Sequence, residues 1–495
     1  MATFHNGSSI WPDTVPANVW GLGGESLWEQ LSSVANSLPP DTPVDARFEL
    51  NIRTGIALVL TFGCGLLANA AGVGGGPFYI PVFNVLLGFN LKMASALSLT
   101  IVSSGALAST FYGLHKKSPR DCDRTLLDFD LALTFLPALL LGVNFGVLFN
   151  ILIPEWLQTA VLVFVLIFVI RSTARKARQQ WDLEQATLKR TVTDSAESAL
   201  TADGLRQPLL DPPDVVTVTT AGDDITLERN DSVKTLTNGR PIVECHVTPV
   251  LENVPRGTKT LAQRIPFRKF AALLVLWVLF LVSQAQKSAY PRCTWEYMTV
   301  WGAQVAVLLL VGGWQIAHQV RKARRNDEDL DPEMRVILSH GSLSGGIRRP
   351  FTVLAQVAGV IATAGVGAGL LGVGGAIFFN PWLLHLGVHP QVTVSTAVLM
   401  ILFSSSAIAL SLSFHNLLNH SYALVFAPIA FVASTIGVTV VGRFVRKSGR
   451  SSIIVIILTV LVAAGTGTTA VFGGLRSYEQ MRRGRGLDFH PLCSR

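Results

Sequence analysis

Two glycine clusters, 300 residues apart, carry the residue types most suited to binding a ligand through the backbone. The first is AAGVGGGPFYIP at 70–81 and the second is LLGVGGAIFFNP at 370–381. The positions that match are Gly72, Val73, Gly74, Gly75, Phe78 and Pro81, which recur as Gly372, Val373, Gly374, Gly375, Phe378 and Pro381. Both clusters lie in apolar runs, where glycine and proline weaken a helix. The repetition predicts two broken helices with a shared purpose.

The chemistry that such breaks offer is anion binding by backbone amides. In hydrocarbon, non-helical backbone survives only where it lines a cavity or is buried in protein. Paired, glycine-interrupted segments in two repeats indicate a transport site near the membrane midplane. The positive end of the half-helix that follows each break stabilises a negative charge. Small-residue helix packing is the alternative, but it accounts for single glycines and not for a six-position match.

We therefore expect a substrate site between the two clusters, formed by glycine backbone and neighbouring polar side chains. Its candidate residues are Asn69, Gly72, Gly74, Gly75, Gly76, Lys92, Ser95, Ser98, Gly372, Gly374, Gly375, Gln391, Ser395, Thr396, Ser404 and Ser405. Lys92 either offers its charge to an anion or extends to the membrane interface, as lysines at helix starts do. The serines serve equally well as ligands or as helix-packing residues.

The distribution of acidic residues also favours an anion. No Asp or Glu occurs in residues 50–120 or in residues 334–478, which cover most of the apolar segments. A cation carrier or a carboxylate proton relay usually needs acids within its spans. The acids nearest to these segments lie at predicted helix ends: Asp128, Asp130, Glu155 and Glu296. Sodium coordination by carbonyl groups stays open, and the sequence does not indicate a coupling ion.

Other chemistries find little support. Gly367, Gly369 and Gly372 spell the dinucleotide pattern GxGxxG, but no acidic residue follows about 20 positions later. The five cysteines are scattered without a CxxC pair, so we expect neither a metal site nor a disulfide framework. No Ser/His/Asp grouping and no phosphate loop appears. We expect no catalytic residues and no cofactor.

Composition places the chain in a membrane. Of its 495 residues, 49% are hydrophobic and 15% are charged, with a mean hydropathy of +0.44. Soluble domains carry roughly 25% charged residues. The net charge of +8 is typical of basic cytoplasmic loops and does not indicate nucleic-acid binding. We predict an all-α, polytopic integral membrane protein; which membrane holds it is not indicated.

Apolar runs predict about 12 membrane segments. They lie at 53–71, 77–88, 91–113, 129–151, 156–170, 267–285, 297–319, 351–372, 374–387, 391–414, 421–442 and 451–475. The expected organisation is a tail (1–50), a first repeat (51–170), a polar loop (171–266), two linker spans (267–320), a cytoplasmic loop (321–349), a second repeat (350–475) and a tail (476–495).

Basic clusters predict the orientation of these segments. RSTARKAR at 171–178, RIPFRK at 264–269 and RKARR at 321–325 mark the cytoplasmic side. If the short segments also cross, an odd number of crossings separates the two glycine clusters and the repeats are inverted. The alternative is that the short segments are re-entrant. We favour inversion, because it places the basic cluster at 443–450 inside.

These motifs resemble the sulfite exporter TauE/SafE family, and its plant-like branch in particular. The resemblance rests on AGVGGGPFYIPVFNVLLGFNLKMASALS, GLLGVGGAIFFNPWLLHLGVHPQVTVSTA and DFDLALTFLPALLLGVNFGVLFNILIPEW. It covers residues 50–475 apart from the polar loop. One departure is Ala376, which stands where the first cluster has Gly76. The resemblance implies a permease for sulfite, sulfonates or related sulfur-containing anions.

Our interpretation is a secondary transporter for small anions that works by rocking one repeat against the other. Its partners are the anionic substrate and the lipid bilayer. The alternative is a membrane receptor or scaffold that keeps the fold and acts through the polar loop.

Overall fold

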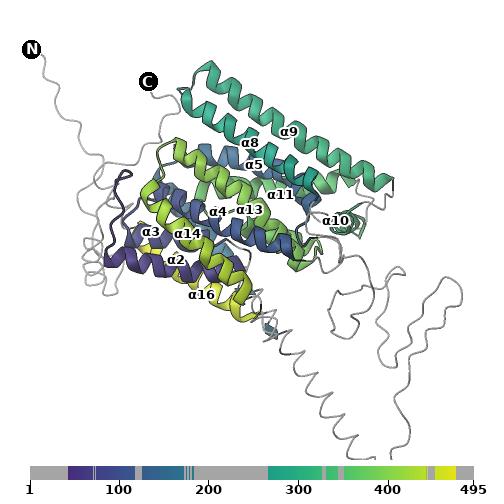
Figure 1. Cartoon of the computed structure of the whole chain (residues 1–495). Helices are drawn as coiled ribbons and strands as arrows, with labels where there is room; N and C mark the ends of the chain where they lie inside the picture. The colour runs from purple at the N-terminus through teal and green to yellow at the C-terminus, as the bar shows by residue number, and fades with distance from the viewer. Residues whose placement is uncertain are drawn as a thin grey trace, which may run out of the picture.

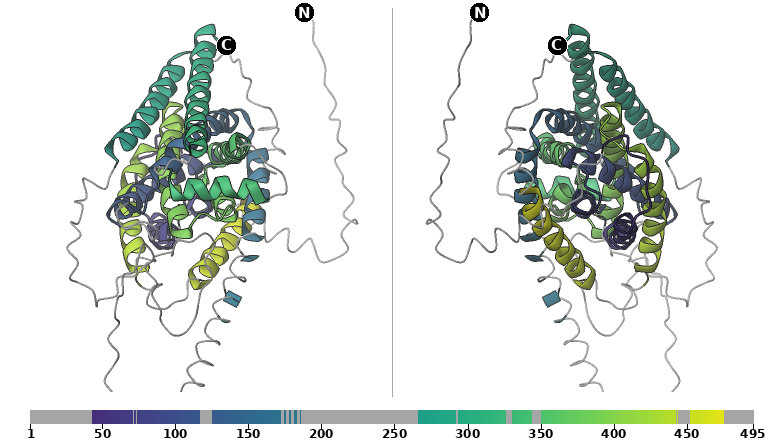
Figure 2. Two further views of the ribbon diagram at one scale, coloured as in Figure 1. Left: turned by 90° about the vertical axis from the view of Figure 1, so that its right-hand side faces the viewer. Right: turned by 90° about the vertical axis from the view of Figure 1, so that its left-hand side faces the viewer.

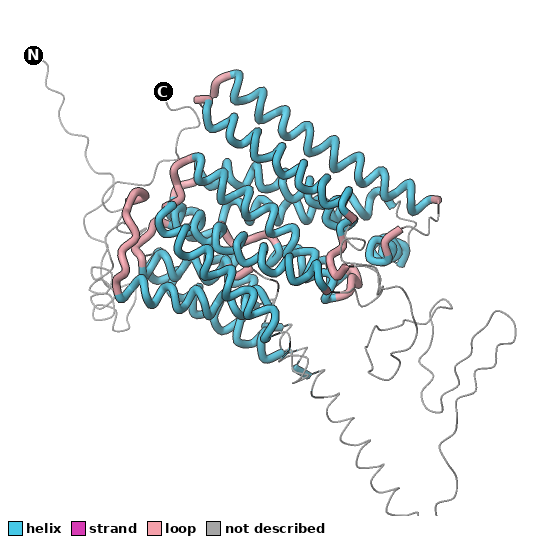
Figure 3. Tube along the Cα trace, in the orientation of Figure 1, coloured by secondary structure: helices cyan, strands magenta, loops and turns pink. Residues whose placement is uncertain are grey.

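The computed structural model describes residues 43–116 except 71 and 73, 125–171, scattered positions up to 185, 266–325 except 292, 330–343, 350–441, 443 and 452–474. In this part of the chain every long regular element is a helix (Figure 3). The helices are α2 (Ile52–Ala70), α3 (Gly76–Leu86), α4 (Leu91–His115), α5 (Phe129–Leu152), a helix over 155–171, α8 (Phe267–Ala289), α9 (Trp295–Arg324), α10 (Pro332–Leu343), α11 (Pro350–Leu371), α12 (Ala376–His385), α13 (Pro390–Phe414), α14 (His420–Ile436) with its π-helical extension η1 (Gly437–Val441), and α16 (Ser452–Thr468) with η2 (Thr469–Gly473).

Eight of the described helices are long and apolar enough to cross a membrane: α2, α4, α5, α8, α9, α11, α13 and α14. The polytopic, all-helical fold predicted from composition is therefore confirmed. One element was not anticipated, because we expected only a loop between 321 and 349. There α10 begins at Pro332 and buries Met334 and Ile337 completely, which explains why this short segment folds.

The two repeats interlock, because each packs a helix against the broken helix of the other. In the first repeat, α5 lies on α11; in the second, α14 lies on α2 (Figure 1). Glycine makes both contacts close: a Cβ atom would come within 2.5 Å of the Val366 carbonyl oxygen at Gly146, and within 2.1 Å of the Leu66 carbonyl oxygen at Gly437. Gly369 packs against Gly146 in the same interface. The GxGxxG match thus includes a helix-packing glycine.

The course of α4 and α13 supports an inverted repeat. Ser104 of α4 donates to the carbonyl oxygen of Ala427 (2.6 Å), and the hydroxyl groups of Ser109 and Ser434 are 2.9 Å apart. These two contacts occur in the same order along both helices, so α4 and α14 run parallel. Because α14 turns back from α13 through residues 415–419, α13 runs antiparallel to α4. Equivalent helices with opposite directions are what an inverted repeat requires.

The two linker spans, α8 and α9, lie side by side at one edge of the bundle (Figures 1 and 2). An ion pair between Lys269 and Asp130 joins the start of α8 to the start of α5. In the turn between α8 and α9, Cys293 is disulfide-bonded, and its partner lies outside the described residues. We expected no disulfide framework from the scattered cysteines, and this single disulfide was not anticipated, because sequence spacing alone does not reveal which cysteines meet.

Candidate functional site

Both glycine clusters break their helices with left-handed backbone. In the first, Gly72, Gly74 and Gly75 have φ values of 70°, 81° and 80°; in the second, Gly372 and Gly374 have values of 71° and 83°. A Cβ atom makes this conformation costly, which explains why the clusters need glycine. Gly375 differs from Gly75, because its φ is −69°.

Each break packs against the helix that follows the other break. A Cβ atom on Gly72 would lie 2.2 Å from a methyl carbon of Val394 in α13, and one on Gly372 would lie 2.4 Å from the Cβ atom of Ser95 in α4. Val394 and Ser95 occupy the same position in their helices, the fifth residue of each. The first glycine of each break therefore contacts the partner repeat at an equivalent point.

The breaks also touch each other directly. A Cβ atom on Gly76 would lie 2.3 Å from the carbonyl oxygen of Val373, so only glycine fits there. The hydroxyl of Ser98 lies 3.3 Å from the carbonyl oxygen of Gly76 and 3.3 Å from that of Gly372. One hydroxyl thus spans both breaks. Ala376, the counterpart of Gly76, is fully buried.

Amide side chains satisfy carbonyl groups that the breaks leave without helical partners. Asn150 and Gln158 donate to the carbonyl oxygen of Leu370 at 2.7 and 2.8 Å, and Asn380 donates to that of Gly72 at 3.3 Å. Sequence reasoning missed these three residues. An amide inside an apolar run, as in LFNIL at 148–152, was the signal that could have revealed Asn150.

The half-helices after the breaks begin without side-chain caps. Gly75 and Gly375 occupy the cap positions of α3 and α12, and among the described residues no side-chain cap hydrogen bond is made to either helix. Both cap residues are buried. Amide groups at such ends, with the helix dipole behind them, stabilise an anion.

Three predicted side chains lie near the first break but already have partners. Asn69 is buried and donates to the carbonyl oxygen of Gly65 (3.0 Å), and Ser95 donates to that of Lys92 (2.8 Å). Lys92 is only 6% exposed, and its ammonium group donates to the carbonyl oxygen of Ile151 at the end of α5 (3.1 Å). It therefore does not extend to solvent; it places a positive charge at the negative end of a helix.

The structure places the predicted side chains of α13 apart from one another. Gln391 is exposed, and Ser395 is half-buried. Thr396 accepts a hydrogen bond from the backbone N–H of Asp128 (3.0 Å). Ser404 and Ser405 donate to a carbonyl of their own helix. Of the predicted set, the seven glycines, Ser95 and Ser98 meet at the breaks, and Asn69 and Lys92 lie within one helical turn of them.

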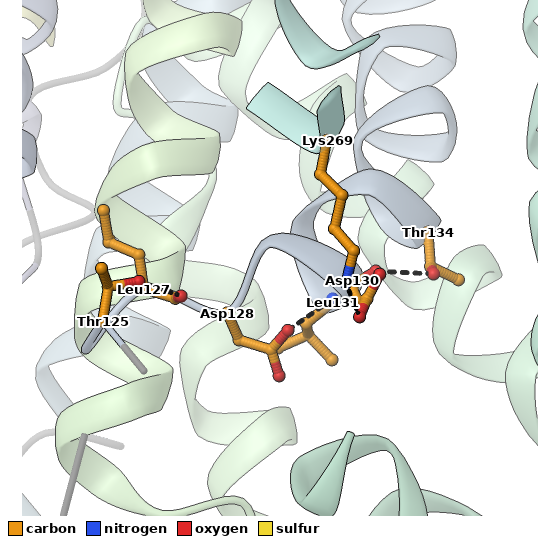
Figure 4. Close-up of polar contacts among 7 residues, drawn as sticks. All are labelled: Thr125, Leu127, Asp128, Asp130, Leu131, Thr134 and Lys269. Carbon is orange, nitrogen blue, oxygen red and sulfur yellow. Dashed lines mark hydrogen bonds and ion pairs between the residues drawn. The ribbon is translucent and has the colours of Figure 1, made fainter. Parts of the chain in front are cut away.

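A charged cluster lies at the start of α5, and sequence reasoning did not connect its members (Figure 4). The Asp128 carboxylate caps the helix by accepting from the N–H of Leu131 (2.9 Å), and Lys269 pairs with Asp130. Burial raises the pKa of Asp128 to about 6; the nearby charges of Asp130 and Glu333 add to this rise, while the Leu131 N–H and Lys269 oppose it.

Comparison with known proteins identifies one family. The model of the sulfite exporter TauE/SafE family matches residues 27–172 and 270–466. Sulfite exporter TauE/SafE family protein 2 of Arabidopsis thaliana is 27% identical over 456 residues, which are 90% of this chain and 89% of that protein. Family protein 3 of the same plant is 25% identical over 454 residues, 90% of this chain and 84% of that protein. No solved structure matches the chain.

Proposed function

Because this chain belongs to the sulfite exporter TauE/SafE family and is an integral, multi-pass membrane protein, we propose that it transports sulfite, sulfonates or related sulfur-containing anions by alternating access. The substrate is bound between the two glycine breaks. The backbone amides that begin α3 and α12 hold the anion, with Ser98 and Lys92 beside them.

The direct contact between the breaks is the observation that carries this proposal. Ser98 spans the carbonyl groups of Gly76 and Gly372, which belong to different repeats. Gly76 leaves no room for even a methyl group before Val373. A substrate between the breaks therefore requires the repeats to separate there, and their separation is the motion that alternating access needs.

The breaks also provide the backbone groups that bind the anion. Carbonyl groups at the break are satisfied by Asn150, Gln158 and Asn380. In the first turns of α3 and α12, Pro77 has no N–H, and the N–H groups of Phe78, Phe378 and Phe379 donate to the carbonyl oxygens of Gly75 and Gly375. The N–H groups that remain for the substrate in this proposal are the first of each helix, those of Gly76 and Ala376. No acidic residue occurs in either repeat close to the breaks, so little opposes the positive potential there.

Flux through purified protein in liposomes tests the proposal. Vesicles would be loaded with radiolabelled sulfite or taurine, and efflux would be followed with and without the protein. We expect saturable, protein-dependent flux of at least one of these anions, inhibited by the other, and none in vesicles that carry a Gly76→Leu variant of equal abundance. Absence of flux for both anions, in either direction and with or without a proton gradient, would reject it.

A further inference from the structure

A buried lysine lies between α5 and α8. Lys287 is 5% exposed, and its ammonium nitrogen is 2.8 Å from the Oδ1 atom of Asn144. Gln284, one turn earlier in α8, donates to the same oxygen at 3.4 Å. Among the described residues no carboxylate pairs with Lys287. An ionisable side chain within a membrane span is costly and usually marks a functional site.

The side chains of this cluster carry more hydrogen-bond donors than acceptors. Asn144 is 2% exposed, and its Nδ2 atom, with two N–H bonds, has no acceptor among the described residues. Lys287 has three N–H bonds and directs one at Asn144. The cluster supplies only two side-chain acceptors, Asn144 Oδ1 and Gln284 Oε1, and the first of them already receives two hydrogen bonds. Unpaired buried donors beside a positive charge are complementary to a group with several anionic oxygens.

The cluster is separate from the breaks although α5 contributes to both regions. Gly142 and Gly146 of α5 pack against α11, whereas Asn144, between them in sequence, contacts α8. Asp130, at the start of α5, does not neutralise the charge of Lys287. It lies about 21 Å from Asn144 along the helix, at 1.5 Å per residue. It is engaged with Lys269 instead.

We propose that Lys287, Gln284 and Asn144 bind an oxyanion group of sulfur or phosphorus between α5 and the α8–α9 pair. This site goes beyond the transport site between the breaks and does not depend on transport. The group comes either from a free anion such as sulfate or from a phospholipid head group, and both present the same oxygens to the three side chains.

Native mass spectrometry of the full-length protein in detergent tests the proposal by the mass that is bound. Sulfate and phosphatidylglycerol would be titrated separately into wild type, Lys287→Gln and Lys287→Arg. We expect Lys287→Gln to weaken binding of one of the two at least tenfold and Lys287→Arg to recover part of it. Lys322→Gln, which removes a charge from the same helical pair, should leave binding unchanged.

Asn144→Asp gives a second test, which remains valid even if the lysine variants fail to fold. Its carboxylate would sit against Lys287 as a built-in counter-ion, so the variant should melt at a higher temperature and bind neither probe at that site. Equal binding of both probes by wild type, Lys287→Gln and Asn144→Asp would overturn the proposal. Loss of binding in Lys322→Gln to the same degree would also overturn it, since attraction would then be non-specific.

Discussion

Gly76 lies against the backbone of Val373, so that the first half-helix of one repeat rests on the break of the other. The approach is possible only because position 76 has no side chain: a Cβ atom there would be 2.3 Å from the Val373 carbonyl oxygen. Backbone cannot give way as a flexible side chain does. The contact therefore fixes how closely the two repeats meet in this conformation.

We expect Gly76→Ala to reduce transport strongly and to lower the melting temperature, because one methyl group forces the breaks apart. Overpacking of a tight interior typically costs about 1–3 kcal/mol. Flux in liposomes and thermal unfolding of the purified variant would measure both effects.

Gly375→Ala is the matched control for this prediction. Gly375 has an ordinary helical φ of −69°, and the nearest neighbours of an added Cβ would be side-chain atoms of Leu139 and Phe379 at 3.3 and 3.4 Å. Flux and stability should stay close to wild type. If the two alanine variants behave alike, the contact between Gly76 and Val373 has no special importance.

Lys92 is buried within one helical turn of Ser95, against which the second break packs. We expect Lys92→Gln to weaken substrate affinity by about tenfold to a hundredfold, since a hydrogen bond to a charged group contributes about 1.5–3 kcal/mol. Lys92→Arg should keep part of the affinity, because the charge remains with a different geometry. Competition by unlabelled substrate in the flux assay would give both values.

The hydrogen bond from Lys92 to the carbonyl oxygen of Ile151 indicates an alternative role for this lysine. If Lys92 serves only to stabilise the end of α5, both variants should keep affinity within about twofold of wild type while Lys92→Gln melts at a lower temperature. That combination would remove Lys92 from the substrate site.

How far the sequence could predict the site depends on whether a feature is local. The breaks at Gly72 and Gly372 were evident, because glycine clusters in apolar runs have a direct backbone consequence. The crosswise contacts, Gly72 on Val394 and Gly372 on Ser95, were not, because they join residues that are far apart in the chain. Periodicity likewise located the helices but could not show that α5 packs on α11.

Equivalent positions in two repeats need not share an environment, and this limits what a repeat can predict. Lys92 and Gln391 follow the breaks at matching positions, yet Lys92 is buried and Gln391 is exposed. Burial depends on neighbours that are distant in the sequence, here the end of α5 at Ile151. Asn150 and Gln158 were missed for the same reason, since their acceptor, Leu370, lies more than 200 residues away.

Asp128 predicts a pH dependence of stability. Its pKa is raised to about 6, above the usual value for an aspartate, so the folded state favours the protonated form. The stabilisation is fully present below about pH 4 and is lost as the pH rises through 6, by at most about 3 kcal/mol. Asp128→Asn should therefore melt at a higher temperature than wild type at pH 7.5 and at about the same temperature at pH 4.

Asparagine can still cap α5 at position 128, so this variant keeps the hydrogen bond to the N–H of Leu131. Asp130→Asn serves as the control, because it removes the partner of Lys269 and should lower the melting temperature at pH 7.5. If the difference in melting temperature between Asp128→Asn and wild type is the same at pH 4 and at pH 7.5, the raised pKa of Asp128 is contradicted.

The polar loop separates the transporter from the receptor or scaffold interpretation. Residues 186–265 lie outside the described residues, and their composition is rich in Thr, Asp and Pro. We expect deletion of residues 190–260 to leave flux unchanged, because the entropy of closing a loop changes only slowly with loop length. A deletion variant that reaches the membrane intact but transports nothing would favour a function that works through the loop.

A disulfide between α4 and α14 tests the motion itself. The hydroxyl groups of Ser109 and Ser434 are 2.9 Å apart and belong to different repeats, so cysteines at both positions are within reach of a disulfide. If transport requires the repeats to move against each other, oxidation of the Ser109→Cys, Ser434→Cys double variant should stop flux, and a reductant should restore it. Ser109→Cys alone, treated identically, controls for effects on the native cysteines. Full flux through protein that maleimide labelling shows to be completely cross-linked would mean that this interface does not move during transport.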